Sequence, residues 1–190
     1  MRRRTRASSP TSSASEQTAG VTVKRLALIR HAKAKQGDRD IERPLARRGR
    51  EDARVIGEWL AERAVPDVVL VSPSVRTRET WQCASAVLPS EPGIIVDDRI
   101  YDNSPQSLVE AIRASDDSVA TLALVGHNPS VQALAARARR PSDEGMEALL
   151  SFPTSTVALM EVDGSWRGFD PRQATLIAVD VCRGDRGGFG

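Results

Sequence analysis

The chain of 190 residues contains only two histidines, and each of them directly follows a short apolar run. His31 follows the letters LALIR, and His127 follows TLALVG. A short apolar run bounded by turn residues is typical of a buried β-strand. Because ligands of open α/β sheets bind just beyond the carboxyl ends of the strands, both imidazoles are expected where such a domain does its chemistry.

Two arginines are expected at the same edge. Arg30 precedes His31, and Arg76 lies in the segment LVSPSVRTRETW, which predicts a strand, a turn and a helix. A guanidinium is a permanent cation whose forked N–H groups match phosphate oxygens. An Arg-His pair alone is common by chance, and a histidine after a strand is more often structural than catalytic. The equivalent positions of the two histidines nevertheless favour a phosphate pocket with a built-in nucleophile.

Phosphoryl transfer requires a positioned nucleophile and cations placed where negative charge develops. His31, as a neutral imidazole, can attack phosphorus and become a phosphohistidine. Arg30 and Arg76 would lower the pKa of this imidazole, which keeps it nucleophilic near neutral pH. His127 is expected to donate a further hydrogen bond. Ser72, together with the amides of the helix that it is expected to cap, would form a weaker anion site.

The elements that must position these residues alternate between strands and helices. This alternation predicts an α/β fold, a three-layer α/β/α sandwich with a mostly parallel central sheet. Ser72 and Ser104, each followed by proline, are typical N-cap residues, and Asp163-Gly164 is expected to join the last two strands by a turn. Trp166 is expected in a turn at the domain edge. The expected strands are 23–30, 68–71, 94–96, 118–125, 156–162 and 174–181, and the expected helices are 46–64, 72–88, 104–114 and 130–139.

Residues 1–20 differ in composition from the rest of the chain. They contain four arginines and one acid among Ser, Thr, Pro, Ala and Gly, so we expect a disordered, basic, serine-rich tail before a domain at 21–190. The tail has a net charge of +3 and the whole chain a net charge of +2, which leaves about −1 for the domain. The basic balance therefore does not indicate nucleic-acid binding.

The expected location is the cytoplasm, with no membrane contact. The first twenty residues lack the apolar core of a secretory signal, although an organellar transit peptide has a similar composition. No run approaches the roughly 18 apolar residues of a membrane span. Cys83 and Cys182 are too few for a disulfide framework. With both histidines assigned to phosphate, no residue cluster has metal-ligand spacing, so neither a metal nor a cofactor is expected.

Five segments resemble the histidine phosphatase superfamily, which includes cofactor-dependent phosphoglycerate mutases and many phosphatases. LIRHAKA resembles its Arg-His-Gly signature, with Ala32 in place of the glycine, and ERPLARRGREDA, SPSVRTRET, LALVGHNPSV and FPTSTVALMEVDG follow in order. The succession is most similar to small SixA-type phosphohistidine phosphatases. The resemblance implies that His31 is the phosphorylated nucleophile and that Arg30, Arg76 and His127 form the phosphate pocket.

Three further residues are weaker candidates. Members of the superfamily that resemble phosphoglycerate mutase place an acidic general acid after the third strand, where this chain has Tyr101 and Asp102. Asp102 is a possible general acid, but the sequence favours a turn or cap residue before the next helix. Lys33 is expected either to bind substrate at the pocket rim or to be a solvated loop charge. Asn128, next to His127, is a candidate substrate contact.

The leading hypothesis is a metal-independent phosphatase that acts through a phosphohistidine intermediate on phosphohistidine in a protein or peptide. A weak acid suits the labile P–N bond better than an alkyl phosphate ester. The alternatives are a broad phosphomonoesterase of small metabolites, a phosphate-recognising binding module, and a nucleic-acid or membrane tether that acts through the basic tail. A mutase is disfavoured because a clear acid is missing. The oligomeric state stays open.

Overall fold

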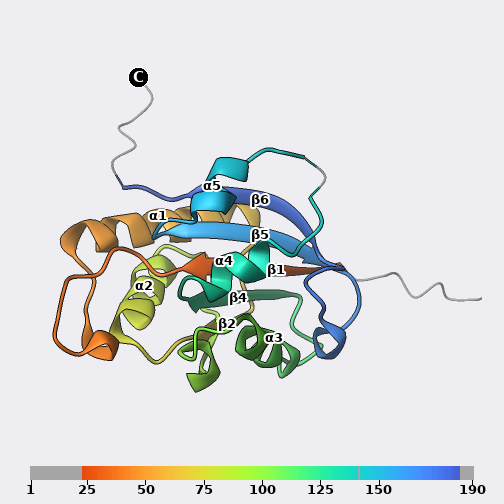
Figure 1. The fold of residues 1–190 in the computed structure, drawn as a ribbon, viewed down its shortest axis with the longest axis horizontal. Helices are drawn as coiled ribbons and strands as arrows, with labels where there is room; N and C mark the ends of the chain where they lie inside the picture. Colours follow the sequence, from red (N-terminus) through yellow and green to blue (C-terminus); the bar gives the residue numbers. More distant parts are fainter. Residues whose placement is uncertain (1–22, 141, 185–190) are drawn as a thin grey trace, which may run out of the picture.

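A six-stranded sheet in the order β3-β2-β4-β1-β5-β6 forms the centre of the computed structural model, which describes residues 23–140 and 142–184 (Figure 1). β1 pairs in parallel with β4, and β2 pairs in parallel with both β4 and β3. Only β5 runs against its two neighbours. The strands are β1 (Lys24–Arg30), β2 (Val68–Val71), β3 (Gly93–Val96), β4 (Thr121–Gly126), β5 (Thr156–Val162) and β6 (Thr175–Val181).

Helices cover both faces of the sheet, which confirms the predicted three-layer α/β/α arrangement (Figure 1). Ala27 and Ile29 of β1 pack in one buried cluster with residues of α1 and α2, whereas Leu26 and Leu28 pack in another with residues of α3, α4 and α5. This is the period of two that a strand covered on both faces requires. The helices are α1 (Arg47–Arg63), α2 (Val75–Ser85), α3 (Pro105–Arg113), α4 (Ser130–Ala135) and α5 (Met146–Ser151), with short 3₁₀ helices η1 (Asp40–Glu42), η2 (Asp98–Ile100) and η3 (Trp166–Gly168).

The strand register brings the two histidines to the same edge of the sheet. Arg30 lies opposite Gly126 in the parallel pair of β1 and β4, so the residues that follow, His31 and His127, leave the sheet side by side. The amide of His31 continues the ladder by donating to the carbonyl of Gly126 at 3.1 Å. Val71, the last residue of β2, lies opposite Val125 of β4, so the chain leading to Arg76 starts at this edge too.

The prediction for the start of α2 was wrong. The helix begins at Val75, with the extended residue Ser74 at the N-cap position, and not with Ser72 as its cap. The hydroxyl of Ser72 pairs with His127 Nε2 at 2.8 Å, so it is not available to cap a helix. In α3 the same pair of residue types behaves as predicted, since Ser104 accepts a hydrogen bond from the amide of Ser107 at 3.0 Å.

The fold differs from the prediction in several other places, which include the end of α2 at Ser85 and the start of β4 at Thr121. α4 ends at Ala135, earlier than predicted, because the amide of Arg139 donates to Ala174 at 2.9 Å beside β6. The connection from β5 to β6 contains η3 and not a simple turn. Trp166 there is fully buried and its Nε1 donates to the carbonyl of Val119 at 2.8 Å, so it is a core residue and not an edge cover.

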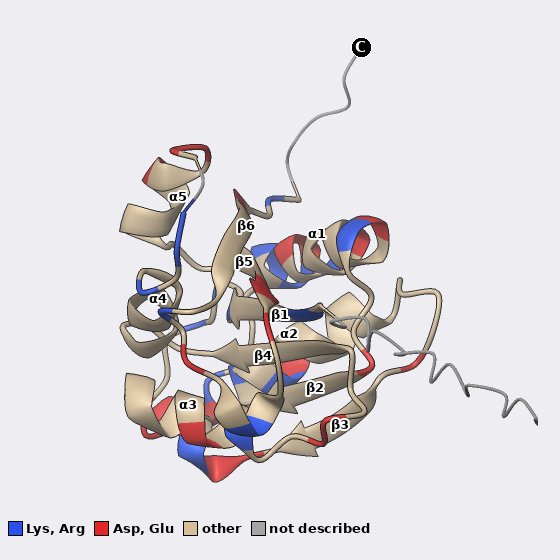
Figure 2. Cartoon of the chain, turned by 90° about the vertical axis from the view of Figure 1, so that its right-hand side faces the viewer, with Lys and Arg blue, Asp and Glu red and all other residues tan. Residues whose placement is uncertain are grey.

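The predicted tail at 1–20 lies outside the described residues. Within residues 23–140 and 142–184, no helix combines the length and apolar character needed to cross a bilayer. Figure 2 shows both signs of charge along α1 and α3, as expected for a domain whose net charge is close to zero.

We expect Gly57→Ala to destabilise the fold, because a Cβ at this position in α1 would lie 2.1 Å from the carbonyl oxygen of Ala84 in α2. The clash is with backbone, so the helices must separate, at a cost of about 1 to 3 kcal/mol despite the better helix propensity of alanine. Urea unfolding of both forms measures the difference. Gly93→Ala is the matched control, since its nearest contact would be an ordinary 3.6 Å. Equal stability of Gly57→Ala and wild type would contradict the packing of α1 on α2.

Candidate active site

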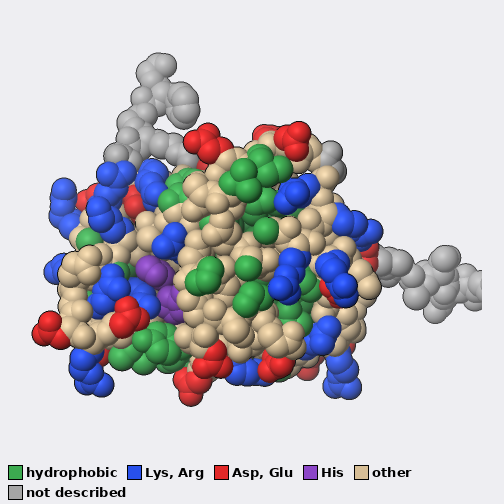
Figure 3. All heavy atoms as spheres, in the orientation of Figure 1, with side chains coloured by type: hydrophobic (Ala, Val, Ile, Leu, Met, Phe, Trp, Pro, Cys, Tyr) green, Lys and Arg blue, Asp and Glu red, His purple; other side chains and the backbone are tan. Residues whose placement is uncertain are grey.

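A pocket of about 540 Å³ opens at the edge where β1, β2 and β4 end. Figure 3 shows the two histidine side chains in a hollow flanked by Lys and Arg side chains. The excess of cations over acids in the lining suits an anionic ligand. The lining residues are Arg30, His31, Lys33, Ala34, Asp40, Arg43, Arg76, Tyr101, Asn103, His127, Asn128 and Thr154.

The ring of His31 has one nitrogen held by the backbone and one that accepts a hydrogen bond from Arg76. Nδ1 lies 2.8 Å from the carbonyl oxygen of Ala32, which can only accept, so Nδ1 carries the proton in the neutral ring. Nε2 therefore has the lone pair, and it faces Nε of Arg76 at 3.3 Å. The amide of Ala32 donates to Thr80 Oγ1 at 3.0 Å, which ties this turn to α2.

The ring of His127 has the opposite tautomer. Its Nδ1 lies 3.3 Å from Arg76 Nη2, which can only donate, so Nδ1 accepts and Nε2 donates to Ser72 Oγ at 2.8 Å. His127 is thus an acceptor on the side that faces Arg76. The predicted donor role toward phosphate requires a second proton at Nδ1, and an incoming dianion would favour that protonation.

Arg76 connects the two rings. It lies in the first turn of α2, is only 6% exposed and contacts both imidazoles, whose centroids are 5.2 Å apart. On its other side, Nη1 donates to the carbonyl of Asp40 at 2.5 Å and Nη2 pairs with the Asp40 carboxylate at 2.8 Å. The structure therefore brings His31, Arg76 and His127 together, as the sequence predicted.

Arg30 is a further cation of the pocket lining. Its Nη1 donates to the carbonyl of Phe152 at 2.6 Å, while its buried Nε has no hydrogen-bond partner among the residues that the structure describes. Phe152 sits at the end of α5 in a left-handed conformation (φ 34°), which turns the chain back toward β5. The Arg30 side chain is thus anchored at one end and lines the pocket beside His31.

The surroundings keep both imidazoles neutral. Burial, followed by the charges of Arg76, Arg30 and Arg43, lowers the pKa of His31 to about 4 even though the hydrogen bond to the Ala32 carbonyl opposes this shift. Burial is also the main reason that the pKa of His127 falls to about 3, with His31 and Arg76 contributing. At neutral pH the lone pair on His31 Nε2 is available for attack on an electrophile.

The weaker candidates have different places in the structure. Lys33 is an exposed residue of the pocket lining. Asn128 also lines the pocket. Its side-chain amide donates to the carbonyl of Phe152 at 3.1 Å and to Gln132 at 3.2 Å, so it links α4 to the end of α5. The carboxylate of Asp102 accepts from Ser107 Oγ at 3.4 Å in the turn before α3, and Asp102 is absent from the pocket lining.

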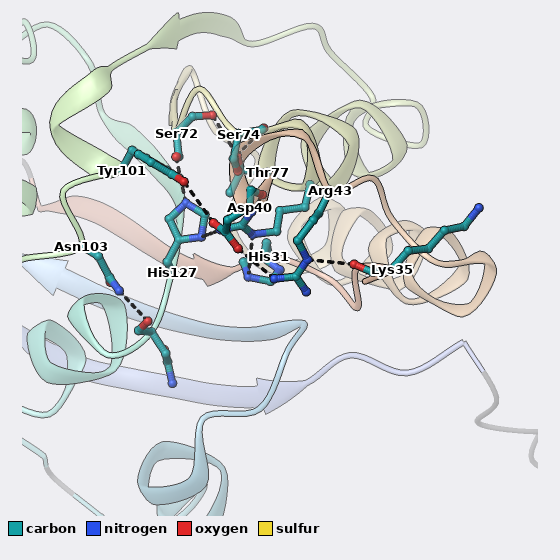
Figure 4. A network of polar contacts seen from close by, with 12 residues as sticks. His31, Lys35, Asp40, Arg43, Ser72, Ser74, Thr77, Tyr101, Asn103 and His127 are labelled. Carbon is teal, nitrogen blue, oxygen red and sulfur yellow. Dashed lines mark hydrogen bonds and ion pairs between the residues drawn. The ribbon is translucent and has the colours of Figure 1, made fainter. Parts of the chain in front are cut away.

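Sequence reasoning missed Asp40 and Arg43. Asp40 pairs with Arg43 at 2.9 Å and accepts a hydrogen bond from the Tyr101 hydroxyl at 3.0 Å (Figure 4). Both residues belong to the charged loop between β1 and α1, where no periodicity identifies an inward-facing side chain. The available signal was the family-like segment that starts at Glu42, because Asp40 lies two residues before it and Arg43 is its second residue.

The lining contains nitrogen donors and a single carboxylate, Asp40. Across the part of the chain that the structure describes, no group of three or more His, Cys, Asp or Glu residues could hold a metal ion. The arrangement can bind a phosphoryl group between cations and present it to the lone pair of His31.

Comparison with known proteins agrees with this geometry. Residues 26–103 match the model of the histidine phosphatase superfamily, branch 1. An uncharacterised protein of Mycobacterium tuberculosis, MT1313, is 35% identical over 164 residues, which cover 82% of this chain and 100% of the relative.

Two solved structures share the fold. A candidate phosphohistidine phosphatase SixA from Nakamurella multipartitia has a TM-score of 0.72 and 28% identity, covering 83% of this chain and 95% of the other. A candidate phosphohistidine phosphatase SixA from Agrobacterium tumefaciens has a TM-score of 0.65 and 30% identity, covering 82% and 96%. By motif, fold and sequence similarity, the chain belongs to the histidine phosphatase superfamily.

Proposed function

We propose that the protein is a phosphatase that removes the phosphoryl group from phosphohistidine in a protein or peptide, through a covalent intermediate on His31. The observation that carries the proposal is the orientation of the His31 ring. Its Nδ1 is held by the Ala32 carbonyl at 2.8 Å, and its unprotonated Nε2 faces Arg76 at 3.3 Å. The similarity to two SixA proteins supports the same substrate class.

The proposed reaction has two steps. In the first, the lone pair of His31 Nε2 forms a bond to phosphorus while the bond from phosphorus to the substrate nitrogen breaks. That electron pair stays on the substrate ring, which leaves as neutral imidazole because its other nitrogen carries a proton. Arg30, Arg76 and a protonated His127 bind the phosphoryl oxygens. In the second, water attacks phosphorus, the electron pair returns to His31 Nε2, and phosphate and a proton are released.

The acids near the pocket favour a nitrogen leaving group. An alkoxide must be protonated as it leaves, whereas an imidazole departs without a strong acid. Although burial opposes ionisation, hydrogen bonds from Arg43, Arg76 and Tyr101 lower the pKa of Asp40 to about 2, so this carboxylate has no proton to give. Burial and the hydrogen bond to Asp40 raise the pKa of Tyr101, which makes it a poor acid.

The second candidate function is a broad phosphomonoesterase acting on small metabolites. The pocket volume of about 540 Å³ is large enough for a sugar phosphate, and the exposed ammonium of Lys33 at its rim suits a second anionic group. A binding module without turnover would retain the same cations. The substrate assay below separates these three functions.

The purified protein should hydrolyse a phosphohistidine peptide much faster than phosphoserine or phosphothreonine peptides, because only the first has a leaving group that needs no strong acid. Phosphate release from the three peptides and from para-nitrophenyl phosphate measures this preference. Chelator treatment should leave the rates unchanged. Efficient turnover of the alkyl esters would favour the phosphomonoesterase, and tight binding without turnover would favour the binding module.

His31→Ala should reduce turnover to background, because the other imidazole of the pocket, His127, is expected to be protonated when it binds the phosphoryl group and then has no lone pair for attack. Rapid acid-free quenching of the wild-type reaction should trap one acid-labile phosphate on the peptide that contains His31, detected by mass spectrometry. Circular dichroism of the variant controls for folding. A phosphate on any other residue, or clear activity of the alanine variant, contradicts the assignment.

Arg76→Lys should lower kcat/KM by roughly a hundredfold, since a buried charged contact to the transition state contributes on the order of 3 kcal/mol. Lysine keeps the charge but cannot bridge two rings and a phosphoryl group with a planar fork. Arg78→Lys is the matched control, because this exposed neighbour on α2 does not line the pocket. Equal effects of the two substitutions would remove Arg76 from the mechanism.

The two histidines should titrate far below their usual range in the folded protein, near pH 4 for His31 and near pH 3 for His127. In the unfolded chain both should titrate near 6.5. The unfolded state therefore takes up these protons first, and stability falls as the pH drops from about 6.5 toward 4. NMR of the two imidazole C–H signals measures both values, with His31→Ala to assign them. A midpoint near 6.5 in the folded protein contradicts the neutral nucleophile.

A further inference from the structure

Asp40 puts a negative charge into a pocket that otherwise binds anions. Its Oδ2 accepts from Arg76 Nη2 at 2.8 Å and from the Tyr101 hydroxyl at 3.0 Å, and its Oδ1 accepts from Arg43 at 2.9 Å. The carboxylate thus comes from η1, on the loop between β1 and α1, and is held by Arg43 of the same loop and by residues from two other parts of the chain (Figure 4). A merely solvated loop acid would not have this set of partners.

The charge is permanent at physiological pH. Although burial favours the protonated form, the hydrogen bonds from Arg43, Arg76 and Tyr101 lower the pKa of Asp40 to about 2. Its side chain is still 52% exposed, so one side of the carboxylate faces the open part of the pocket. Asp40 can therefore accept a hydrogen bond from a ligand without losing its partners inside the protein.

The position of Asp40 corresponds to the leaving-group side of a bound phosphoryl group. The attacking and leaving atoms lie roughly in line in phosphoryl transfer. His31 Nε2 is at the inner wall, 3.3 Å from Arg76, so the leaving group must lie toward the open side. Asp40 contacts the same guanidinium at other nitrogens, Nη1 and Nη2, and its half-exposed side chain suits a place on that open side.

We propose that Asp40 selects the leaving group: its carboxylate accepts the ring N–H of a departing imidazole and repels substrates with a second anionic group. This inference rests on the proposed function. In phosphohistidine, one ring nitrogen bears phosphorus and the other can bear a proton. A carboxylate beside that second nitrogen stabilises the protonated ring.

The proton balance explains why this contact assists the reaction. With the remote nitrogen protonated, cleavage of the P–N bond returns the electron pair to the ring and releases a neutral imidazole. No proton has to be delivered to the leaving atom. The same carboxylate would repel a carboxylate or a second phosphoryl group at that place, which disfavours the polyanionic metabolites of a small-molecule phosphatase.

Asp40→Asn tests the proposal through two ratios. The ratio of kcat/KM for a phosphohistidine peptide to that for para-nitrophenyl phosphate should fall about tenfold, as expected for loss of one charge-assisted hydrogen bond. The ratio of the inhibition constants of pyrophosphate and phosphate should also fall, because pyrophosphate places its second phosphoryl group near residue 40. Glu42→Gln is the matched control, since Glu42 lies in the same 3₁₀ helix but does not line the pocket.

The outcomes separate the two proposals. If the wild type turns over both substrates and Asp40→Asn leaves both ratios unchanged, Asp40 only positions Arg76 and the selection of the leaving group is wrong. If the wild type hydrolyses para-nitrophenyl phosphate but not the peptide, the proposed function is wrong and this inference fails with it. Asp40→Glu should keep the wild-type pyrophosphate ratio, because the charge is retained.

Discussion

The buried guanidinium of Arg76 is the charge around which the pocket is organised. A buried cation is tolerated only when its N–H groups have acceptors, and here the acceptors are two imidazole nitrogens and the backbone and carboxylate of Asp40. Imidazoles can fill this role only when they are neutral. The charge that would bind phosphate therefore also sets the protonation state of the proposed nucleophile.

The position of Arg76 depends in turn on how α2 joins the sheet. Because α2 begins at Val75, its first turn carries Arg76, which contacts His31 and His127 just after the ends of β1 and β4. Thr80, one turn later, accepts from the amide of Ala32 and fixes the residue after His31. Glu79 accepts from the amide of Leu45 at 2.7 Å, so the same helix holds the loop that carries Asp40. One helix thus aligns the proposed nucleophile His31, the guanidinium of Arg76 and the carboxylate of Asp40.

These contacts also explain what the sequence could predict. His31 and His127 were recognisable because each follows an apolar run that predicts a strand. The carboxyl ends of parallel strands lie at the same edge of a sheet, so the two positions could be placed together without knowing any side-chain contact. Asp40 was missed because it lies in a polar loop with no periodicity, and because two of its partners, Arg76 and Tyr101, are 36 and 61 residues away. Ser72 was misassigned for a related reason. The local capping rule was outweighed by a hydrogen bond to His127, 55 residues away.

The two imidazoles start from the same neutral state, yet their locked nitrogens prepare them for different roles. The Ala32 carbonyl fixes the proton on His31 Nδ1, so its pocket nitrogen keeps a lone pair that a bond to phosphorus would consume. Ser72 occupies His127 Nε2, so its pocket nitrogen can gain a proton. The negative charge of a bound phosphoryl dianion favours protonation of His127 Nδ1. The proposed substrate would thus convert an acceptor into a donor, while the nucleophile stays unprotonated until it reacts.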